Sequence, residues 1–199
     1  AGRQRVVPDA ISYLRSLGVP IPETGNLGGT LGVRFSGLSS PTEGAVTVRT
    51  ATPVSQGRVG LAYQGIPRGL TGPSYLFGLR HDATDRTNVA IQNAGAASEG
   101  SITLRLTVFA GLPIFPSLWP ISRALPDQTL APGEFRQLTG VLESISVFLS
   151  NGFVLVERID GTAPYFAYAV VNDQVSSDGS FIAPVAADFA ANARGLTLP

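Results

Sequence analysis

The sequence predicts a mainly β protein: an antiparallel β-sandwich preceded by a second, partial strand-rich unit with one short helix. Apolar and polar residues alternate in many short runs, and 23 Gly and 15 Pro among the 199 residues separate these runs. Hydrophobic residues make up 44% of the chain and charged residues 14%. This composition is typical of a globular protein rather than a disordered one, and the length allows a sizeable core.

The N-terminal residues 1–18 predict a short helix. Pro8 and Asp9 precede apolar residues at helical spacing, and Gly18 follows the last of them. A proline near the first turn and a glycine after the last residue are typical helix boundaries. We expect this to be the one substantial helix of the chain.

Strand patterns follow, and a turn-rich segment marks the expected domain boundary. Residues 30–36 and 45–52 alternate around a Gly- and Ser-containing turn, which predicts a hairpin, and residues 58–63 predict a further strand. Gly and Pro dominate residues 66–74. The chain is therefore expected to divide into a partial β unit, residues 1–70, and a β-sandwich domain, residues 71–199.

The clearest strand pattern lies in residues 79–110 and predicts a second hairpin. Apolar and polar residues alternate in 87–93 and again in 102–108, on either side of the small and polar residues 94–100. Each predicted strand has one apolar face. We expect the two strands to pair and to form one side of the core.

The remainder of the sandwich domain is predicted as strands around a proline-broken cover. Prolines interrupt residues 111–126, so this stretch is expected to cross the end of the sandwich in an extended form. A short helix is expected within 141–149. Residues 153–159 and 165–171 predict a strand pair, and 181–185 a closing strand.

An internal echo suggests that part of the domain occurs twice. Four stretches keep one order at a spacing of roughly 120–130 residues, the size of one sandwich domain. The pairs are 1–18 with 131–152, 29–37 with 152–161, 45–53 with 166–174, and 57–65 with 179–187. The first copy has no counterpart to residues 79–110, so we expect open sheet edges that a neighbouring strand completes.

Composition disfavours several classes of partner and site. The chain has no Cys and no Lys, and its 14 Arg balance 14 acidic residues. Zero net charge provides no long-range attraction for nucleic acid or an anionic membrane. No run approaches the roughly 18 apolar residues of a membrane span.

Several stretches of the sequence together carry a family resemblance. GLRHDATDRTNVAIQNAG, SITLRLTVFAG, LAPGEFRQLTGVL and VERIDGTAPYFAYAVVNDQVSSDGSFIAPV cover most of the chain beyond Gly57. With them the chain resembles a recurrent Ig-like β-sandwich module of large, uncharacterised secreted bacterial proteins. The resemblance implies an Ig-like sandwich and an extracellular or cell-surface location, and it brings no catalytic residue.

Two groups of residues are candidates for catalysis. His81 lies near Asp82 and Asp85, where an imidazole beside carboxylates suits acid–base chemistry. The sequence favours the simpler interpretation, a turn in which Asp and Thr side chains bond to local backbone. A carboxylate pair for glycoside hydrolysis has three candidates, Glu134, Glu143 and Glu157. We expect no enzymatic activity.

Two further sets are candidates for binding. The hard oxygens of one loop suit a calcium ion, and the residues are Asn172, Asp173, Ser176 and Asp178. An ordinary Asx turn explains the same pattern and is favoured, so no cofactor is expected. Trp119, Tyr165 and Tyr168 are candidates for a sugar-binding surface, although alternation places Tyr165 and Tyr168 on opposite faces of a strand.

We therefore expect a non-enzymatic structural module of an extracellular or cell-surface assembly. Subunits joined head-to-tail into a fibre by strand complementation would account for the incomplete first copy. The expected partners are further copies of the chain, as a homopolymer or as tandem repeats. The alternative is an extracellular carbohydrate-binding or adhesion module with a glycan as its partner.

Overall fold

The computed structural model describes residues 2, 4–25, 30–40, 43–66, 69–111, 121–145, 149–176 and 178–187. These residues are mainly β, with antiparallel sheets and, among the elements they form, one short α-helix, which confirms the predicted mainly β class. Two compact units separate at residue 31: Ala1–Leu31 and Gly32–Pro199. The division at residue 70 into independent domains stays a prediction. None of the helices within the described residues is long and apolar enough to cross a membrane.

The first unit contains the predicted helix, α1 (Ala10–Ser16). Asp9 caps it, because its Oδ1 accepts a hydrogen bond from the Ser12 backbone N–H at 2.9 Å. Gly18 takes a φ of +84°, a conformation that ends helices at low cost. The Arg15 Nε atom then donates to the carbonyl of Ile21 at 2.9 Å and fixes the chain after the helix.

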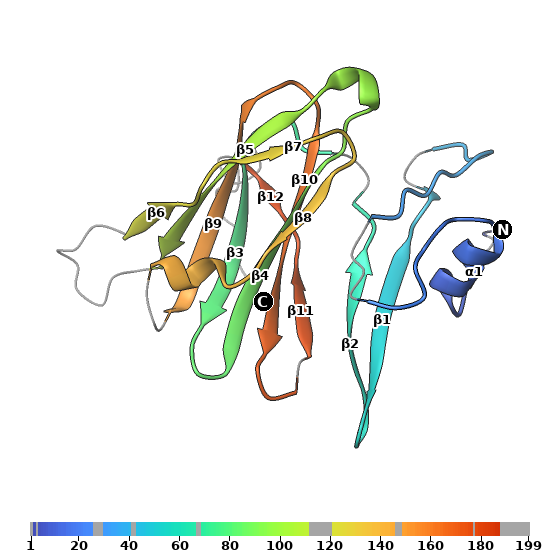
Figure 1. Cartoon of the computed structure of the whole chain (residues 1–199), viewed down its shortest axis with the longest axis horizontal. Helices are drawn as coiled ribbons and strands as arrows, with labels where there is room; N and C mark the ends of the chain where they lie inside the picture. The colour runs from blue at the N-terminus through green and yellow to red at the C-terminus, as the bar shows by residue number, and fades with distance from the viewer. Residues whose placement is uncertain are drawn as a thin grey trace. The chain divides into compact units, whose positions relative to one another are not determined.

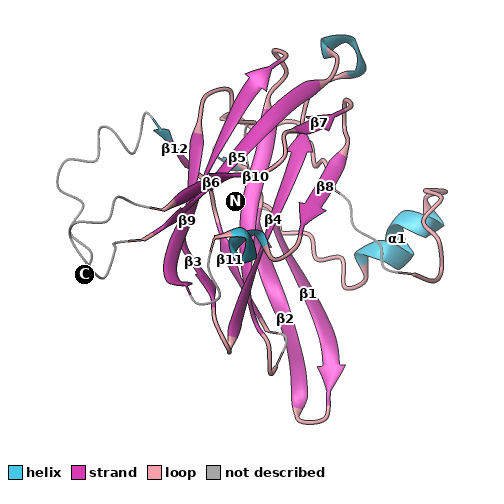
Figure 2. Ribbon diagram, turned by 60° about the vertical axis from the view of Figure 1, so that its left-hand side comes forward, coloured by secondary structure: helices cyan, strands magenta, loops and turns pink. Residues whose placement is uncertain are grey.

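In the second unit, β1 (Thr47–Val54) and β2 (Gly57–Gln64) form a two-stranded antiparallel sheet (Figure 2). The predicted hairpin between residues 30–36 and 45–52 is wrong, since 30–36 is not a strand. Only Ser55 and Gln56 separate β1 from β2, and a two-residue connection closes a hairpin with the least loss of entropy.

Two larger sheets follow, with strand orders β11-β10-β4-β8 and β12-β3-β9-β5-β6 (Figure 1). The short β7 also pairs with β5. The strands are β3 (Ser74–His81), β4 (Asp85–Asn93), β5 (Ile102–Ala110), β6 (Ser122–Ala124), β7 (Gln128–Leu130), β8 (Phe135–Leu138), β9 (Leu149–Asp160), β10 (Tyr165–Asp173), β11 (Gly179–Ile182) and β12 (Val185–Ala186). The predicted short helix within 141–149 is the 3₁₀ turn η3 (Val141–Ser144), and a second turn, η2, spans Ala97–Glu99.

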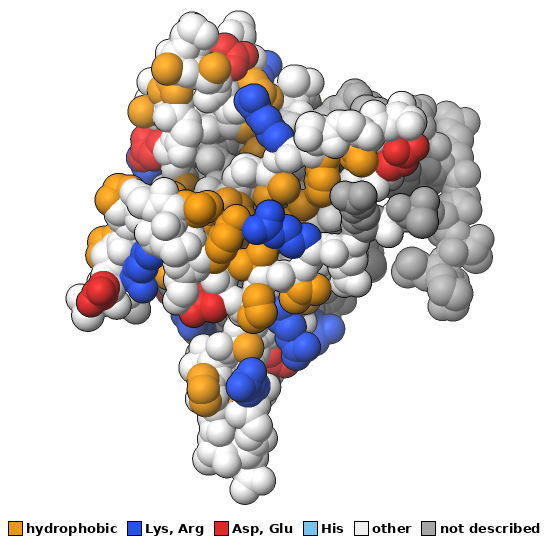
Figure 3. All heavy atoms as spheres, turned by 90° about the vertical axis from the view of Figure 1, so that its right-hand side faces the viewer, with side chains coloured by type: hydrophobic (Ala, Val, Ile, Leu, Met, Phe, Trp, Pro, Cys, Tyr) orange, Lys and Arg blue, Asp and Glu red, His pale blue; other side chains and the backbone are white. Residues whose placement is uncertain are grey.

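One apolar core lies between these two sheets. Alternate residues of the central strands are buried, as a sheet with one inward face requires. The largest fully buried side chains come from both sheets and their connections: Tyr165, Leu76, Leu79, Ile91, Ile102, Leu104, Leu106, Leu130, Leu142, Val89, Val108 and Val154. On the face drawn in Figure 3, apolar and Arg side chains are interspersed and the acidic ones are scattered.

The two strand pairs predicted in the sandwich are not pairs. β4 belongs to the first sheet and β5 to the second, and β9 and β10 are divided in the same way. The buried side chain of Asn93 forms the corner between β4 and β5: its Nδ2 donates to the carbonyls of Gly100 and Leu130 at 3.0 and 3.1 Å. The alternation of apolar and polar residues is the same whether two strands pair in one sheet or face each other across a core. It therefore does not show that the chain crosses from one sheet to the other at these connections.

The echo is matched in one half only. β1 with β2 and β10 with β11 are both antiparallel hairpins, as the stretches 45–65 and 166–187 suggest. By contrast, residues 30–37 form no strand, whereas their counterpart lies in β9.

Candidate functional site

The β1–β2 hairpin contacts the outer face of the first large sheet. Val59, Leu61 and Tyr63 alternate along β2 and share one side of the hairpin. The Tyr63 ring lies edge-on to Tyr168 of β10 and Phe181 of β11, with centroids 5.8 and 5.6 Å away. These contacts place the hairpin over β10 and β11.

A second contact fixes the hairpin at the tip of the β10–β11 turn. The Gly60 backbone N–H donates to Oδ1 of Asp178 at 3.1 Å. Gly60 also permits a close approach, because a Cβ at this position would lie 2.0 Å from the carbonyl oxygen of Thr50. The glycine is therefore required by the hairpin itself.

Between the hairpin and the sheet runs a groove of about 560 Å³, a size within the range of about 300–1,000 Å³ that ligand sites occupy. Aliphatic residues and Tyr63 form part of its wall. Its polar lining consists of hydroxyls and amides, from Thr50, Thr52, Asn88, Gln137, Asn172 and Ser176. Among the described residues that line it, none carries a formal charge at neutral pH.

Much of the hydrogen-bonding capacity of this lining is unused. Asn88 Oδ1 accepts from the Gly140 N–H at 3.3 Å, and Asn172 Nδ2 donates to the Val170 carbonyl at 3.3 Å. The Thr52 hydroxyl and the Gln137 amide have no hydrogen-bond partner within the described part of the chain. The groove therefore presents groups that both donate and accept.

Burial raises the pKa of Tyr63, which is part of this wall, and of Tyr168, which lies behind it. Desolvation, with the neighbouring Tyr63, raises the pKa of Tyr168 to about 12, and desolvation also raises the pKa of Tyr63. Both hydroxyls therefore stay protonated at neutral pH and do not serve as bases.

Comparison with family models, curated proteins and solved structures finds no match to this chain.

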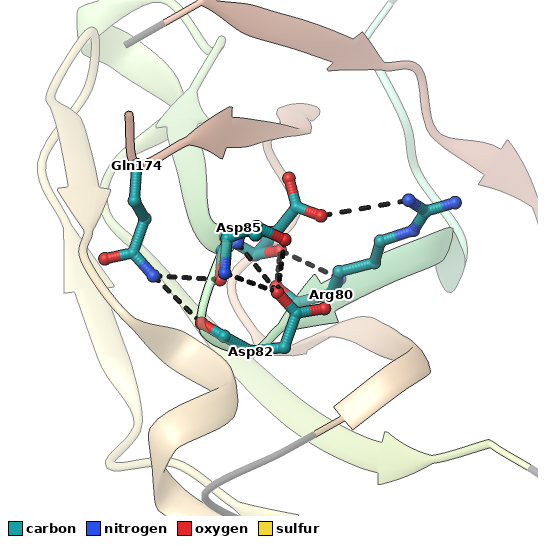
Figure 4. Close-up of polar contacts among 6 residues, drawn as sticks. Arg80, Asp82, Asp85 and Gln174 are labelled. Carbon is teal, nitrogen blue, oxygen red and sulfur yellow. Dashed lines mark hydrogen bonds and ion pairs between the residues drawn. The ribbon is translucent and has the colours of Figure 1, made fainter. Parts of the chain in front are cut away.

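The His81–Asp85 segment is the predicted turn (Figure 4). Asp82 Oδ1 accepts from the backbone N–H groups of Thr84 and Asp85 at 2.8 and 2.9 Å, and from the Thr84 hydroxyl at 2.8 Å. The Thr84 backbone hydrogen bond is the largest cause that lowers the pKa of Asp82. These local bonds account for the carboxylate without catalysis.

The same turn is bound to the residue that follows β10, and an ion pair joins the strands on either side of it (Figure 4). Gln174 Nε2 donates to the carbonyl of Asp82 at 2.9 Å, and Asp85 forms an ion pair with Arg80 at 3.8 Å. Nδ1 of His81 is buried without a hydrogen-bond partner within the described residues. The structure thus joins His81 to neither carboxylate by a hydrogen bond.

The three glutamates lie on different elements. Glu134 accepts from the Ala131 N–H at 2.9 Å and pairs with Arg136 at 2.5 Å in the turn before β8. Glu143 lies in η3 and Glu157 in β9. Nothing in these contacts assembles a carboxylate pair.

The loop from Asn172 to Asp178 shows Asx-turn bonding. Asp173 Oδ1 accepts from the N–H groups of Val175 and Ser176 at 2.9 and 2.5 Å, and from the Ser176 hydroxyl at 2.9 Å. These bonds lower the pKa of Asp173, and Asp178 is bonded to Gly60. Within the described ranges, no group of three or more His, Cys, Asp or Glu residues is arranged to hold a metal ion.

The predicted aromatic surface is only partly present. Tyr165 has 0% exposure, so its assignment to a binding surface is wrong. Its hydroxyl faces the core-side polar groups of Ser74, Gly72 and Val156. Tyr168 lies on the opposite face, as alternation predicted, and packs behind Tyr63. Trp119 lies outside the described residues.

Sequence reasoning missed an aromatic row on the outer face of the second large sheet. Tyr75 stacks on Phe77 with centroids 5.4 Å apart, and Phe109 stacks on Phe153 at 4.6 Å. The spacing of Tyr75 and Phe77 around the inward Leu76 is the signal that could have revealed it. Because these rings cover one another's faces, they stabilise neighbouring strands rather than form a flat sugar platform.

Proposed function

We propose that the chain is a non-enzymatic structural module of an extracellular or cell-surface assembly, built from copies or tandem repeats of itself. The observation that supports this most is the free edge of β1. Within the part of the chain that the structure describes, this strand pairs with β2 and no other strand, and all eight of its residues are exposed. A long strand with an unpaired edge is a template for a strand of another chain.

The register of the hairpin identifies the backbone groups of that edge. Val54 and Gly57 flank the two-residue turn, so they exchange hydrogen bonds across the hairpin. Alternation then directs the N–H and C=O groups of Thr47, Arg49 and Ala51 away from β2. Pro53 lies at the next such position, where its missing N–H breaks no bond of the hairpin.

The complementary edge belongs to β3. On its side away from β9, only Ser74 and Tyr75 are paired, with the two residues of β12. The rest of β3 lacks a strand on that side within the described residues. Docking of β1 of one copy against β3 of the next is a head-to-tail contact, which propagates as a filament unless the rotation closes a ring.

Substitution of Arg49 tests this proposal. Arg49→Pro removes one outward N–H and leaves the hydrogen bonds to β2 intact, whereas Arg49→Ala removes the charge and keeps the N–H. We expect the wild type and Arg49→Ala to assemble with rising concentration, measured by light scattering and electron microscopy, and Arg49→Pro to stay monomeric. Monomeric wild type at every concentration, or assembly of Arg49→Pro equal to that of the wild type, would refute strand complementation.

We infer further that the sandwich is Ig-like in its central strands. In Ig-like folds the B and E strands pair in one sheet and the C and F strands in the other. β3 and β9, and β4 and β10, have this arrangement in chain order. Tyr165 at the start of β10 bonds backbone upstream, as the tyrosine corner does. The inference requires its hydroxyl to stabilise the fold; a Tyr165→Phe variant as stable as the wild type would contradict it.

A further inference from the structure

We propose that the groove between the β1–β2 hairpin and the outer face of the β10–β4–β8 strands binds a neutral oligosaccharide. The site is distinct from the β1 and β3 edges, and the proposal does not depend on self-assembly. It differs also from the aromatic surface expected from the sequence, because Tyr63 is the one aromatic residue among the described residues that line the groove.

The lining selects an uncharged ligand. Its polar groups are amides and hydroxyls, and no described lining residue provides an Arg, Asp or Glu side chain to pair with a charged sugar. Burying an unpaired charge is strongly unfavourable, so sulfated, sialylated or uronic acid glycans are disfavoured. A neutral sugar meets no such penalty.

The lining also matches the hydroxyl pattern of a sugar. The amides of Gln137 and Asn172 and the hydroxyl of Thr52 each combine donor and acceptor capacity. Adjacent sugar hydroxyls need the same combination. The apolar faces of pyranose rings then find Val59, Val170 and the ring of Tyr63 along the wall.

An extended peptide fits this groove less well. Peptides that bind sheets pair with a free strand edge, through main-chain hydrogen bonds. The floor of this groove is a sheet face, where the backbone groups of β10 are already paired with β4 and β11. The Gly60 N–H, on the side of β2 away from β1, is bonded to Asp178. Side chains, rather than backbone groups, are therefore what a ligand of this groove can bind.

The test is binding of the full chain to an array that contains neutral and acidic oligosaccharides, followed by calorimetry with the best ligand. Thr52→Val and Gln137→Ala remove groove groups that make no hydrogen bond within the described structure. Thr47→Val and Gln64→Ala are the matched controls, since both side chains lie on the other face of the hairpin. Each groove variant is expected to weaken binding about tenfold, and each control to leave it unchanged.

Three results would overturn the proposal. The first is the absence of binding to any neutral oligosaccharide at millimolar concentration, and the second is binding confined to acidic glycans. The third is an equal loss of affinity in the groove variants and in their controls. Circular dichroism and melting temperature of all four variants separate loss of the site from loss of the fold.

Discussion

One buried hydroxyl links the two large sheets. Tyr165 begins β10, and its hydroxyl oxygen lies 3.0 Å from Ser74 Oγ of β3. The hydroxyl donates a shared hydrogen bond to the carbonyls of Gly72 and Val156, at 2.9 and 3.1 Å. Each of these groups would be left without this partner if the hydroxyl were absent. A tyrosine is therefore favoured over a phenylalanine at this position.

Tyr165→Phe is expected to lower the free energy of unfolding by about 1–3 kcal/mol, because buried polar groups lose a partner while the ring volume is kept. Urea unfolding followed by circular dichroism measures the change. Tyr168→Phe is the control at neutral pH, since the Tyr168 hydroxyl has no hydrogen bond within the described residues. Equal losses in both variants would contradict the role assigned to Tyr165.

The sequence could predict that Tyr165 and Tyr168 face opposite ways, but not which one faces the core. Both sides of β10 are apolar, with Ala167 and Ala169 beside Tyr165, and Phe166 and Val170 beside Tyr168. The side with alanines is buried, because large leucines of the other sheet fill the space opposite. Phe166 lies on the outer face, opposite Gln92.

Strands were easier to predict than their partners. The sequence predicts β4, β5, β9 and β10 as strands, but the predicted pairs β4 with β5 and β9 with β10 are wrong. Alternation shows that each strand has one apolar face, but it does not show which sheet contains the strand. β6 and β7 are three residues each, too short for a periodic signal. The groove was missed for the same reason, since it depends on where the hairpin docks.

The hairpin has a glycine that tests its packing. In Gly60→Ala the added Cβ would meet the Thr50 carbonyl oxygen at 2.0 Å and the Ala51 Cα at 2.9 Å. We expect a loss of about 1–3 kcal/mol, as for other overpacked sites. Hydrogen exchange of the β1 and β2 amides should accelerate, more than exchange in β9.

Gly32→Ala provides the matched control, because no atom lies within 4 Å of its added Cβ and its φ is not positive. It should leave exchange in the hairpin unchanged. Slow exchange of the hairpin amides in Gly60→Ala, equal to the wild type, would show that the strands tolerate a side chain there.

Stability at alkaline pH reports on the fold as a unit. The chain has no Lys, so above the range of its N-terminus the five tyrosines are the side chains that titrate before Arg. Burial raises the pKa of Tyr63, Tyr165 and Tyr168, the last to about 12. An unfolded tyrosine ionises near a pKa of about 10.

The unfolded chain therefore loses these protons first as the pH rises. Stability provided by the neutral tyrosines is fully present below pH of about 10 and is lost progressively toward about 12. Urea unfolding across this range should show a falling free energy, and Tyr168→Phe should fall less steeply. A slope unchanged by Tyr168→Phe would argue against its burial beside Tyr63.

The two-residue strand β12 has a consequence for how readily copies would join. It is tethered to the edge that an incoming β1 needs, so it competes with an effective concentration on the order of millimolar. Among the described residues, β12 pairs with this edge through Val185 and Ala186, and the Ala187 N–H donates to the Pro73 carbonyl at 2.9 Å, whereas β1 offers eight residues. β12 would then act as a weak built-in competitor that sets the concentration threshold for assembly.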